Sequence, residues 1–345
     1  MAQKLKEEND RREKEGLLAT GIKVPEMSLD NDLYKQTAVN SSIALITIGR
    51  SSGEGVDRGL DGDFNLSQVE RAMIDKVSDT FHAQGKKVIV ILNIGGVIET
   101  ASWKDKVDGI LLAWQVGQEG GNAVADILSG KSNPSGKLTM TFPVQYSDVP
   151  SAKNWVINTH VDWMGTDEPD LQQTTYAEGI FVGYRYYNTF NVKPSYEFGY
   201  GLSYTNFDVS NLQLSNKTFE GNMTVTVDVK NTGKIAGKEV VELYLSAPAK
   251  NLQKPTSELK AFAKTKQLLP GETQKLTLTI KVKDLASFDE NTSAWVAEAG
   301  TYNVLVGTSS LNIKQSANFT LAADKVVEKT HKAFASDMAF EELKR

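Results

Sequence analysis

The sequence predicts a mixed α/β domain, with a doubly wound and mostly parallel sheet, followed by an all-β sandwich. In the first half of the chain, short apolar runs alternate with longer amphipathic ones, which is typical of βαβ units. In the second half, short alternating strands are separated by turn signals about every 8 to 12 residues, which favours a β-sandwich. A length of 345 residues agrees with two domains, because a usual single domain has roughly 100 to 200 residues.

The α/β domain is predicted at residues 38–149. Its first strand is a continuous apolar run with no polar face, which predicts a sheet covered by helices on both sides. Ser67 and Glu70 form the pattern of a capping box at the start of the long helix, and Gly85 lies where its C-cap is expected. In chain order, the expected elements are strand Ile43–Gly49, helix Ser67–Gln84, strand Lys87–Ile94, a short helix near Ile98–Lys106, strand Gly109–Trp114, helix Gly120–Leu128 and strand Lys137–Phe142.

The segments on either side of this domain have different predicted structures. Residues 1–37 are predicted as a charged lead-in segment, in which Met1–Gly16 is a charge run, and the stretch Thr20–Asn40 is expected to be extended. The sandwich is predicted at residues 206–323, and a charged helical tail at residues 324–345. The strands expected in the sandwich are Met223–Val229, Glu239–Leu245, Leu259–Thr265, Gln274–Ile280 and Thr301–Gly307.

A tyrosine-rich connector is predicted at residues 150–205, between the two domains. Seven of the eleven tyrosines lie within Tyr176–Tyr204, and several glycines lie among them. Such aromatic rings can stack on sugar rings, or they can join two domains, because tyrosine buries its ring while its hydroxyl group keeps a polar partner. We favour the packing role, and sugar stacking is the alternative.

Composition and charge argue against several classes of function. The net charge of −5 is mixed along the chain and leaves no basic stripe, so we expect neither nucleic acid nor membrane as a partner. The absence of cysteine excludes disulfides, thiolate metal ligands and a cysteine nucleophile. No apolar run approaches the ~20 residues that span a bilayer, and the first residues are charged where a signal peptide needs an apolar core. As written, the chain is expected in the cytoplasm, unless its true N-terminus lies outside this sequence.

The segment Arg50–Arg58 carries the clearest functional signal in the sequence. It follows the first apolar strand and holds Glu54 between Gly53 and Gly55. In open parallel sheets, ligands bind beyond the carboxyl ends of the strands, so Glu54 lies where a ligand-facing group is expected. The two glycines permit unusual backbone angles and leave room for the carboxylate to project. The alternative is a flexible surface turn that carries a solvated acid.

Three kinds of chemistry can be weighed for this loop. Phosphate binding is disfavoured, because no Gly-x-Gly-x-x-Gly leads into a helix and because the loop is rich in acids that repel phosphate. A divalent cation is a weaker alternative, since Asp61 and Asp63 supply only a fragment of a calcium loop. We therefore predict no metal and no cofactor. The third chemistry is general acid/base catalysis, in which Glu54 protonates a leaving oxygen and then deprotonates a water molecule.

Acid/base catalysis at a glycoside imposes two further requirements. The acid needs a raised pKa, and in a retaining glycosidase a second carboxylate lies only about 5 Å away. Asp108, Glu119 and Asp126 have no comparable setting, because they lie before a strand, near a helix start and on a helix face. The α/β domain thus offers one catalytic carboxylate without its partner.

The stretch Thr47–Arg58 resembles the acid/base loop of family 3 glycoside hydrolases, the retaining β-glucosidase family. The likeness extends over about Pro25–Leu321, and the β-sandwich is similar to the fibronectin-III-like domain of that family. By position in the motif, Glu54 is similar to the general acid/base. Further stretches that resemble the family, in order, are Val88–Gly95, Asp108–Glu119, Asn133–Pro143, Glu178–Tyr187 and Tyr196–Tyr204.

The resemblance implies hydrolysis of terminal non-reducing β-D-glucosyl residues with retention of configuration. It also implies a TIM-type barrel, as a domain or a separate subunit, that carries the aspartate nucleophile and most groups that bind the β-glucoside or oligosaccharide substrate. No barrel is present in this sequence, so the isolated chain is expected to be inactive or nearly so. The chain is then either a fragment of a longer enzyme, which we favour, or one subunit of a split enzyme.

Other functions remain open at this stage. A β-xylosidase or mixed glycosidase of the same family is the nearest alternative, because the pocket that selects the sugar belongs to the barrel. A non-catalytic module that binds carbohydrate or supports a partner is the alternative from another class. Arg50, Asp57 and Arg58 also match the family motif, and we interpret Asp57 and Arg58 as a local ion pair that stiffens the loop rather than as catalytic residues.

Overall fold

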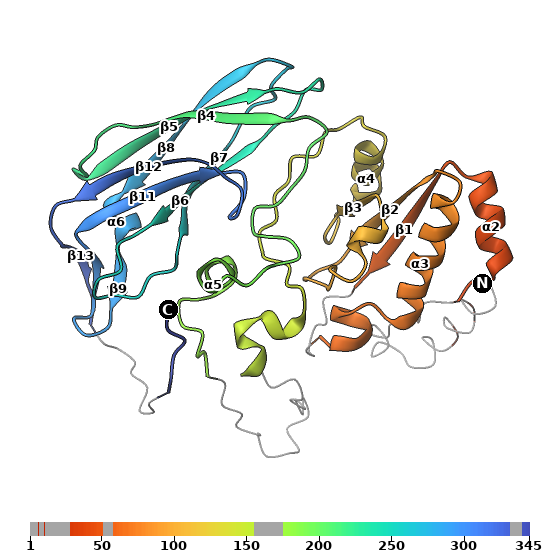
Figure 1. Cartoon of the computed structure of the whole chain (residues 1–345), viewed down its shortest axis with the longest axis horizontal. Helices are drawn as coiled ribbons and strands as arrows, with labels where there is room; N and C mark the ends of the chain where they lie inside the picture. The colour runs from red at the N-terminus through yellow and green to blue at the C-terminus, as the bar shows by residue number, and fades with distance from the viewer. Residues whose placement is uncertain (1–5, 7–9, 11–27, 51–57, 155–174, 332–339) are drawn as a thin grey trace. The chain divides into compact units, whose positions relative to one another are not determined.

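The computed structural model divides into two compact units (Figure 1). One comprises the described residues up to Ala125, and the other comprises the described residues from Asp126 onward. The residues that the structure describes are Lys6, Asp10, 28–50, 58–154, 175–331 and 340–345. Most of the predicted Met1–Gly16 charge run lies outside them, as does the central part of the predicted acid/base loop. Among the described residues, no helix is both long and apolar enough to cross a membrane.

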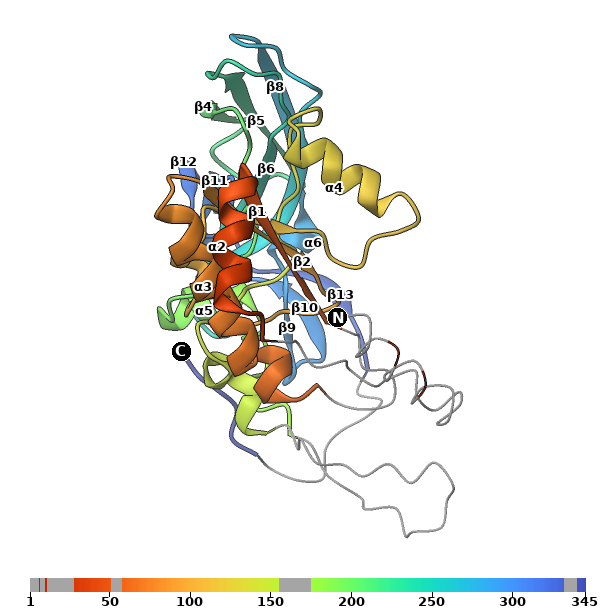
Figure 2. The ribbon, with the colours of Figure 1, turned by 90° about the vertical axis from the view of Figure 1, so that its right-hand side faces the viewer.

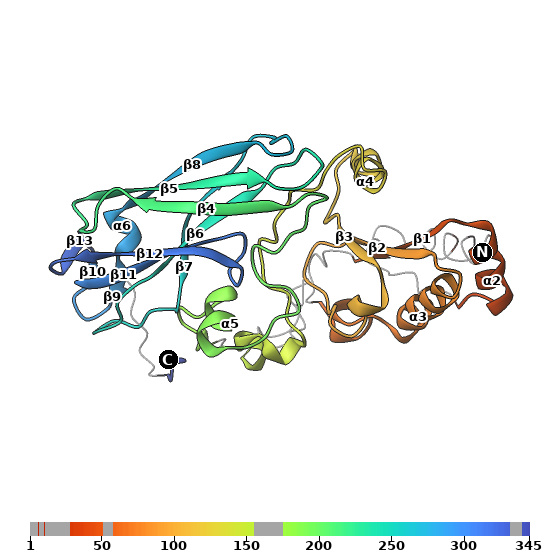
Figure 3. The same cartoon turned by 45° about the horizontal axis from the view of Figure 1, so that its top comes forward.

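The first unit contains a three-stranded parallel sheet in the order β1-β2-β3. Its strands are β1 (Ile43–Gly49), β2 (Lys87–Asn93) and β3 (Gly109–Leu112). Helix α3 (Gln68–His82) packs against one face of this sheet, as Figure 3 shows, and helix α2 (Asn31–Asn40) contacts α3 (Figure 2). Helix α4 is Gly120–Leu128, as predicted. The core consists of alternate strand residues and one face of α3, including Ile46, Ile48, Ile74, Val88, Val90 and Leu92.

Among the described residues, strand β1 is buried on one face only, although its apolar sequence predicts burial on both. Its residues alternate between exposed and buried, and Ile43 and Leu45 are 45% and 51% exposed. Ile46 and Ile48, on the opposite face, are buried against the helix side. An apolar run is compatible with burial on one face or on both, so the run length alone could not decide between them.

Residues 31–40 form helix α2 rather than the predicted extended stretch. Asp30 acts as the N-cap, because its side chain accepts a hydrogen bond of 2.9 Å from the backbone N–H of Asp32. Tyr34 and Ala38 lie four residues apart, which places them on one helix face, and both are buried. The short polar cap and this pair of buried residues stabilise the helix although its other positions are mostly polar.

Three other predicted elements are shorter in the structure or absent from it. The short helix near Ile98–Lys106 is reduced to a 3-10 turn, η3 (Lys104–Lys106). The predicted strand Lys137–Phe142 is absent from the second unit, where Phe142 makes a single antiparallel bridge with Tyr196. Strand Gly109–Trp114 is shorter than predicted, because β3 ends at Leu112.

The second unit is built around a β-sandwich whose two main sheets form layers visible in Figure 3. One sheet has the order β12-β11-β6-β7 and the other β4-β5-β8. Their apolar side chains form one core, which includes Met223, Val227, Leu243 and Ile280. The strands are β4 (Phe207–Leu214), β5 (Asn222–Asn231), β6 (Val240–Ser246), β7 (Glu258–Lys264), β8 (Thr273–Lys281), β11 (Gly300–Gly307) and β12 (Ile313–Leu321).

The predicted helical tail at residues 324–345 is wrong where the structure describes it. Lys325–Lys329 form strand β13, which pairs antiparallel with β10 (Ala294–Ala297), and β10 pairs with β9 (Ser287–Asp289). Residues 340–345 have no regular structure, and residues 332–339 lie outside the described part. Adjacent valines, Val326 and Val327, favour a strand over a helix because their branched side chains suit a pleated surface.

The tyrosine-rich connector packs against the sandwich within the second unit. Tyr184 begins helix α5 (Tyr184–Phe190), its ring lies 4.8 Å from that of Phe198 and 5.8 Å from that of Tyr244, and its hydroxyl oxygen accepts a 2.7 Å hydrogen bond from the backbone N–H of Leu259. This arrangement supports the packing role for Tyr184. Tyr176 and Tyr204 differ, since they are 65% and 46% exposed.

Candidate active-site loop

The candidate acid/base loop leaves the sheet at the carboxyl end of β1. The backbone N–H of Arg50 still donates to the carbonyl oxygen of Asn93 at 3.1 Å, so the β1–β2 pairing extends one residue beyond the strand. Glu54 and Asp57 lie within residues 51–57, outside the described residues. The structure therefore describes the two residues that flank this segment, Arg50 and Arg58.

Arg50 fixes the first flank of the loop through a buried ion pair. Its guanidinium group donates to both carboxylate oxygens of Glu70, at 2.7 and 3.0 Å. The two side chains are only 2% and 7% exposed. A two-pronged arginine–carboxylate contact is geometrically specific, so it sets the orientation of Arg50 as well as its position.

Glu70 connects this ion pair to the start of helix α3. Its carboxylate accepts a 2.7 Å hydrogen bond from the backbone N–H of Ser67, while the Ser67 hydroxyl accepts from the Glu70 N–H, which completes the predicted capping box. Burial alone would raise the pKa of Glu70, but the hydrogen bonds from Arg50 and Ser67 outweigh it and hold the pKa below its usual value. Glu70 thus stays ionised, and its carboxylate both caps the start of helix α3 and binds Arg50 at the loop flank.

Arg58 fixes the second flank through different partners. Its guanidinium group donates to the Asp63 carboxylate at 2.8 and 3.1 Å and to the carbonyl oxygen of Val97 at 2.9 Å. It also lies close against Gly96, where an added Cβ atom would come within 2.6 Å of the guanidinium nitrogen. The absence of a Cβ atom at Gly96 leaves room for the Arg58 guanidinium group in its present position.

Asp63 is the residue that the two flanks share. Its backbone carbonyl accepts from the Arg50 side chain at 2.8 Å, and its carboxylate binds Arg58. It lies in the tight turn Leu60–Phe64, in which Gly62 has a positive φ of 71° and Phe64 is buried. The described partner of Arg58 is therefore Asp63, whereas the predicted partner, Asp57, lies outside the described residues.

Trp114 and Gln115 follow β3 at the same carboxyl edge of the sheet, and the sequence analysis did not single them out. Trp114 has a φ of 57°, a left-handed conformation that is uncommon for a bulky residue. The Gln115 side chain lies against Gly95, where an added Cβ atom would be 2.7 Å from its amide nitrogen. The rule that pointed to Glu54, that ligands bind beyond strand ends, also selects these two residues.

The acids set aside in the sequence analysis all have structural contacts. Asp108 lies at the amino end of β3 and accepts from Lys87, from His82 and from the backbone N–H of Val88. Its hydrogen bond with Lys87 is the largest of the effects that lower its pKa. Glu119 accepts from Asn122, and Asp126 pairs with Lys131 at 2.9 Å. Within the described ranges, no group of three or more His, Cys, Asp and Glu side chains could hold a metal ion.

Comparisons with known proteins agree with the fold of both units. Residues 5–204 match the model of the glycosyl hydrolase family 3 C-terminal domain, and residues 239–310 match the fibronectin type III-like domain. A β-glucosidase from Ruminococcus albus is 39% identical over 328 residues, which cover 93% of this chain and 32% of that protein. An exo-α-(1→6)-L-arabinopyranosidase from Bifidobacterium breve is 33% identical, covering 84% of this chain and 36% of that protein.

A solved structure gives the same result. β-Glucosidase 3B from Thermotoga neapolitana, in complex with glucose, is 47% identical to this chain with a TM-score of 0.80. The alignment covers 94% of this chain and 44% of that protein, so the chain spans less than half the length of its relatives. By these matches, the chain belongs to glycosyl hydrolase family 3 and comprises the C-terminal domain of that family followed by a fibronectin type III-like domain.

Proposed function

We propose that this chain is the acid/base-bearing part of a retaining β-glucosidase that hydrolyses terminal non-reducing β-D-glucosyl residues. Glu54 is the proposed general acid/base, and the nucleophile is an aspartate on a barrel domain that is not part of this chain. The observation that supports this most directly is the anchoring of both loop flanks by Asp63, at the sheet edge where ligands bind.

In the proposed reaction, Glu54 acts twice. It first donates its proton to the glycosidic oxygen while the aspartate attacks the anomeric carbon, so that the glycosidic bond breaks and a glycosyl-enzyme forms. It then removes a proton from water, which attacks the same carbon and releases the sugar with retained configuration. Proton transfer of this kind contributes typically about 10² to 10⁴-fold in rate.

The fixed flanks explain how a loop residue can perform this chemistry. An acid must lie within hydrogen-bond reach of the leaving oxygen, and a small misplacement costs rate. Anchoring Arg50 through Glu70 and Arg58 through Asp63 restricts where the seven residues between them begin and end. In this proposal the two arginines are positioning residues and do not touch the substrate.

The test is the substitution Glu54→Gln in the complete enzyme that includes the barrel. We expect turnover of alkyl β-glucosides and cellobiose to fall about 10²-fold or more, while aryl glucosides with good leaving groups lose much less in the glycosylation step. Asp61→Asn is a matched control, because Asp61 is an exposed acid near the same loop. Equal losses on both substrate types would contradict the acid role.

Activity assays with two separate polypeptides test whether the chain is one subunit of a split enzyme or a fragment of a longer one. Assays of this chain with and without a separately produced barrel distinguish a subunit of a split enzyme, which mixing activates, from a fragment, which it does not. The expectation is that the chain alone is inactive or nearly so, since the nucleophile is elsewhere.

A second candidate is a β-xylosidase or mixed glycosidase. The similarity to an exo-α-(1→6)-L-arabinopyranosidase supports it, because that name describes release of a pentose rather than of glucose. Comparing kcat/KM of the complete enzyme for 4-nitrophenyl β-D-glucoside, β-D-xyloside and α-L-arabinopyranoside decides between the two. The leading proposal requires the highest value for the glucoside.

A further inference from the structure

The carboxyl edge of the sheet in the first unit presents a polar side chain that the proposed reaction does not use, Gln115. We propose that Gln115 binds a hydroxyl group of the leaving alcohol and so favours glycosides whose leaving group is itself a sugar. This inference rests on the function proposed for Glu54 and adds a contact on the leaving-group side of the same site. Gln115 then determines leaving-group specificity.

Both ends of the loop that carries Glu54 are bonded to the turn after β2. At the first end, the backbone N–H of Arg50 donates to the carbonyl oxygen of Asn93 at 3.1 Å. At the second end, the Arg58 side chain donates to the carbonyl oxygen of Val97 at 2.9 Å. A side chain that contacts this turn therefore lies beside the anchored ends of the loop.

Gln115 contacts the middle of that turn. An added Cβ atom at Gly95 would lie 2.7 Å from the amide nitrogen of Gln115 and 3.0 Å from its amide carbon. At the next residue, Gly96, an added Cβ atom would lie 2.6 Å from a guanidinium nitrogen of Arg58. The Gln115 amide and the Arg58 guanidinium group thus lie against adjacent glycines, at the second end of the loop.

The backbone at Trp114 brings Gln115 to this position. Strand pairing continues as far as Ala113, whose N–H donates to the carbonyl oxygen of Leu92 at 2.9 Å. Trp114 then has a φ of 57°, so the chain turns out of the strand direction. A left-handed backbone is unfavourable for tryptophan, and residues in such conformations gather at active sites and ligand sites. The fold therefore holds Gln115 beside the loop at a conformational cost.

Gln115 has the exposure and the free polar groups of a ligand contact. The residue is exposed, and its side-chain amide makes no hydrogen bond to another residue that the structure describes. A glutamine amide offers two N–H donors and one carbonyl acceptor, and a sugar hydroxyl group both accepts and donates. A glutamine that only stabilised the turn would bond to the backbone of that turn.

The proposed reaction assigns this contact to the leaving group. Glu54 protonates the glycosidic oxygen, which departs with the alcohol, while the nucleophile attacks the anomeric carbon from the opposite side. A side chain beside the ends of the acid/base loop is then on the side of the departing alcohol. Because an amide forms no hydrogen bond with an apolar leaving group, Gln115 favours disaccharides over alkyl glucosides.

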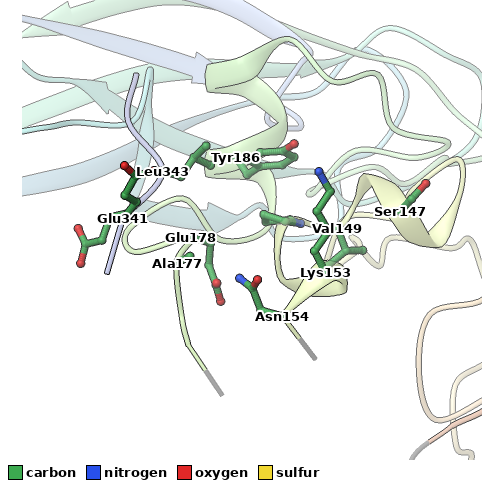
Figure 4. A pocket seen from close by; sticks show the side chains of 11 residues that line it. Ser147, Val149, Lys153, Asn154, Ala177, Glu178, Tyr186, Glu341 and Leu343 are labelled. Atoms are coloured by element: carbon green, nitrogen blue, oxygen red, sulfur yellow. The ribbon is translucent and has the colours of Figure 1, made fainter. Parts of the chain in front are cut away.

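A cavity of about 550 Å³ beside the connector in the second unit offers no comparable assignment (Figure 4). Glu178, Glu341 and Glu342 line it together with Lys153, so a cation and an anion would each meet a like charge. The buried Oε2 atom of Glu178 does not face the cavity. Its lining therefore selects no class of ligand.

The test compares two substrates of the complete enzyme that includes the barrel. Cellobiose and cyclohexyl β-D-glucoside both have poor leaving groups that need protonation, but only cellobiose carries hydroxyl groups on the leaving ring. Gln115→Ala and Gln115→Met should each lower kcat/KM for cellobiose about threefold to tenfold, mainly through KM, because one neutral hydrogen bond is lost. For the cyclohexyl glucoside, the loss should stay below about twofold.

Gln84→Ala is the matched control for these variants. Gln84 is an exposed glutamine that precedes β2, at the opposite edge of the sheet, and its replacement should change neither kcat/KM value. Since Gln115 is exposed as well, neither of its variants removes a core contact.

A further variant moves the Gln115 amide without changing it. Gly95→Ala adds a Cβ atom where the amide now lies, so the flexible Gln115 side chain has to shift. The φ of Gly95 is not positive, so alanine adds no left-handed strain. We expect the same selective loss for cellobiose, about threefold to tenfold. Gly117→Ala is the control, because an added Cβ atom there meets no described atom within 4 Å.

Three results overturn the assignment of Gln115. They are equal losses on the two substrates, losses no larger than that of Gln84→Ala, and full activity of Gln115→Met on cellobiose, which would indicate packing instead of hydrogen bonding. The function proposed for Glu54 fails on a different comparison, that of alkyl with aryl glucosides for Glu54→Gln. The two failures are therefore distinguishable.

Discussion

Glu242 is a carboxyl group enclosed within the second unit, far from water. It is 4% exposed, lies on β6 and accepts a hydrogen bond from the Tyr244 hydroxyl group. Gly199 lies so close that an added Cβ atom would be 2.3 Å from its Oε2 atom. The charged groups that act on it are Lys137, which favours ionisation, and Glu239 and Glu197, which oppose it. Burial is the largest effect and raises the pKa of Glu242 to about 7.

Glu242 should make the second unit less stable as the pH rises. The folded pKa of about 7 exceeds the unfolded value, so between these two values the folded state binds more protons than the unfolded state. The contribution of Glu242 to the free energy of unfolding is therefore fully present below about pH 4, near the ordinary pKa of a glutamate. It is lost as the pH rises through the folded pKa of about 7. The total loss is on the order of 3 kcal/mol.

Glu242→Gln should remove this pH dependence and stabilise the chain at pH 8, since no buried carboxyl group then has to ionise. Urea unfolding at pH 5 and pH 8 measures the effect as the difference in unfolding free energy between the variant and the parent. Glu220→Gln, in an exposed position, serves as the control and should show no such difference. An equal pH response of the Glu242 variant and the parent would show that Glu242 titrates normally.

Arg50 should contribute strongly to the stability of the first unit. Replacing it by methionine leaves the buried Glu70 carboxylate without its main partner, which costs about 3 to 5 kcal/mol for a buried ion pair. The double variant Arg50→Met/Glu70→Gln should cost less than Arg50→Met alone, because no unpaired charge stays buried. Denaturant unfolding of the parent, of Arg50→Met, of Glu70→Gln and of the double variant forms the test. Strictly additive losses would contradict a direct interaction between the two side chains.

At the level of elements, the capping box of α3 joins helix stability to the loop flank. Ser67→Ala removes the hydroxyl group that accepts from the Glu70 N–H, and we expect a loss of about 1 kcal/mol in unfolding free energy. Ser132→Ala is the matched control, because Ser132 is exposed and its hydroxyl caps no helix. Thermal unfolding compares the two. A loss no larger than that of the control would mean that the box contributes nothing.

The elements that the sequence predicts well are those whose pattern is local. The alternation of β5 and β8 and the capping box of α3 each lie within one continuous segment, so periodicity and spacing identify them. Helix α2 was missed because its evidence is a single cap at Asp30 and two buried residues, which is too little against a polar background. Strand β13 was missed because its pairing partner, β10, supplies the hydrogen bonds from far along the chain.

The residues of the candidate site also fall into those that a local motif predicts and those that only the folded structure brings together. Glu54 is predictable because its glycine-flanked motif is continuous, although its placement lies outside the described residues. The pairing of Arg58 with Asp63 was not predictable, since Asp57 and Asp61 lie nearer to Arg58 in sequence and only the Leu60–Phe64 turn brings Asp63 to it.

At the scale of the whole molecule, the residues that the structure describes form two hydrophobic cores that share no residue. One is formed by residues between Ala38 and Trp103, and the other by residues between Val209 and Leu321. Each core belongs to one compact unit. Because apolar burial is the main source of folding free energy, separate cores imply that each unit has its own stability.

Separate cores predict two unfolding transitions, which core substitutions should shift one at a time. Ile74 and Leu243 are both fully buried, one in each core, so Ile74→Ala and Leu243→Ala should each cost about 2 to 5 kcal/mol in their own unit. Differential scanning calorimetry should show Ile74→Ala lowering one midpoint and Leu243→Ala the other, with the second midpoint unchanged in each case. The pH response of Glu242 should belong to the transition that Leu243→Ala lowers, since both residues lie on β6. If either substitution shifted both midpoints equally, the units would unfold as one cooperative body, and the anchored loop could not be treated as a property of the first unit alone.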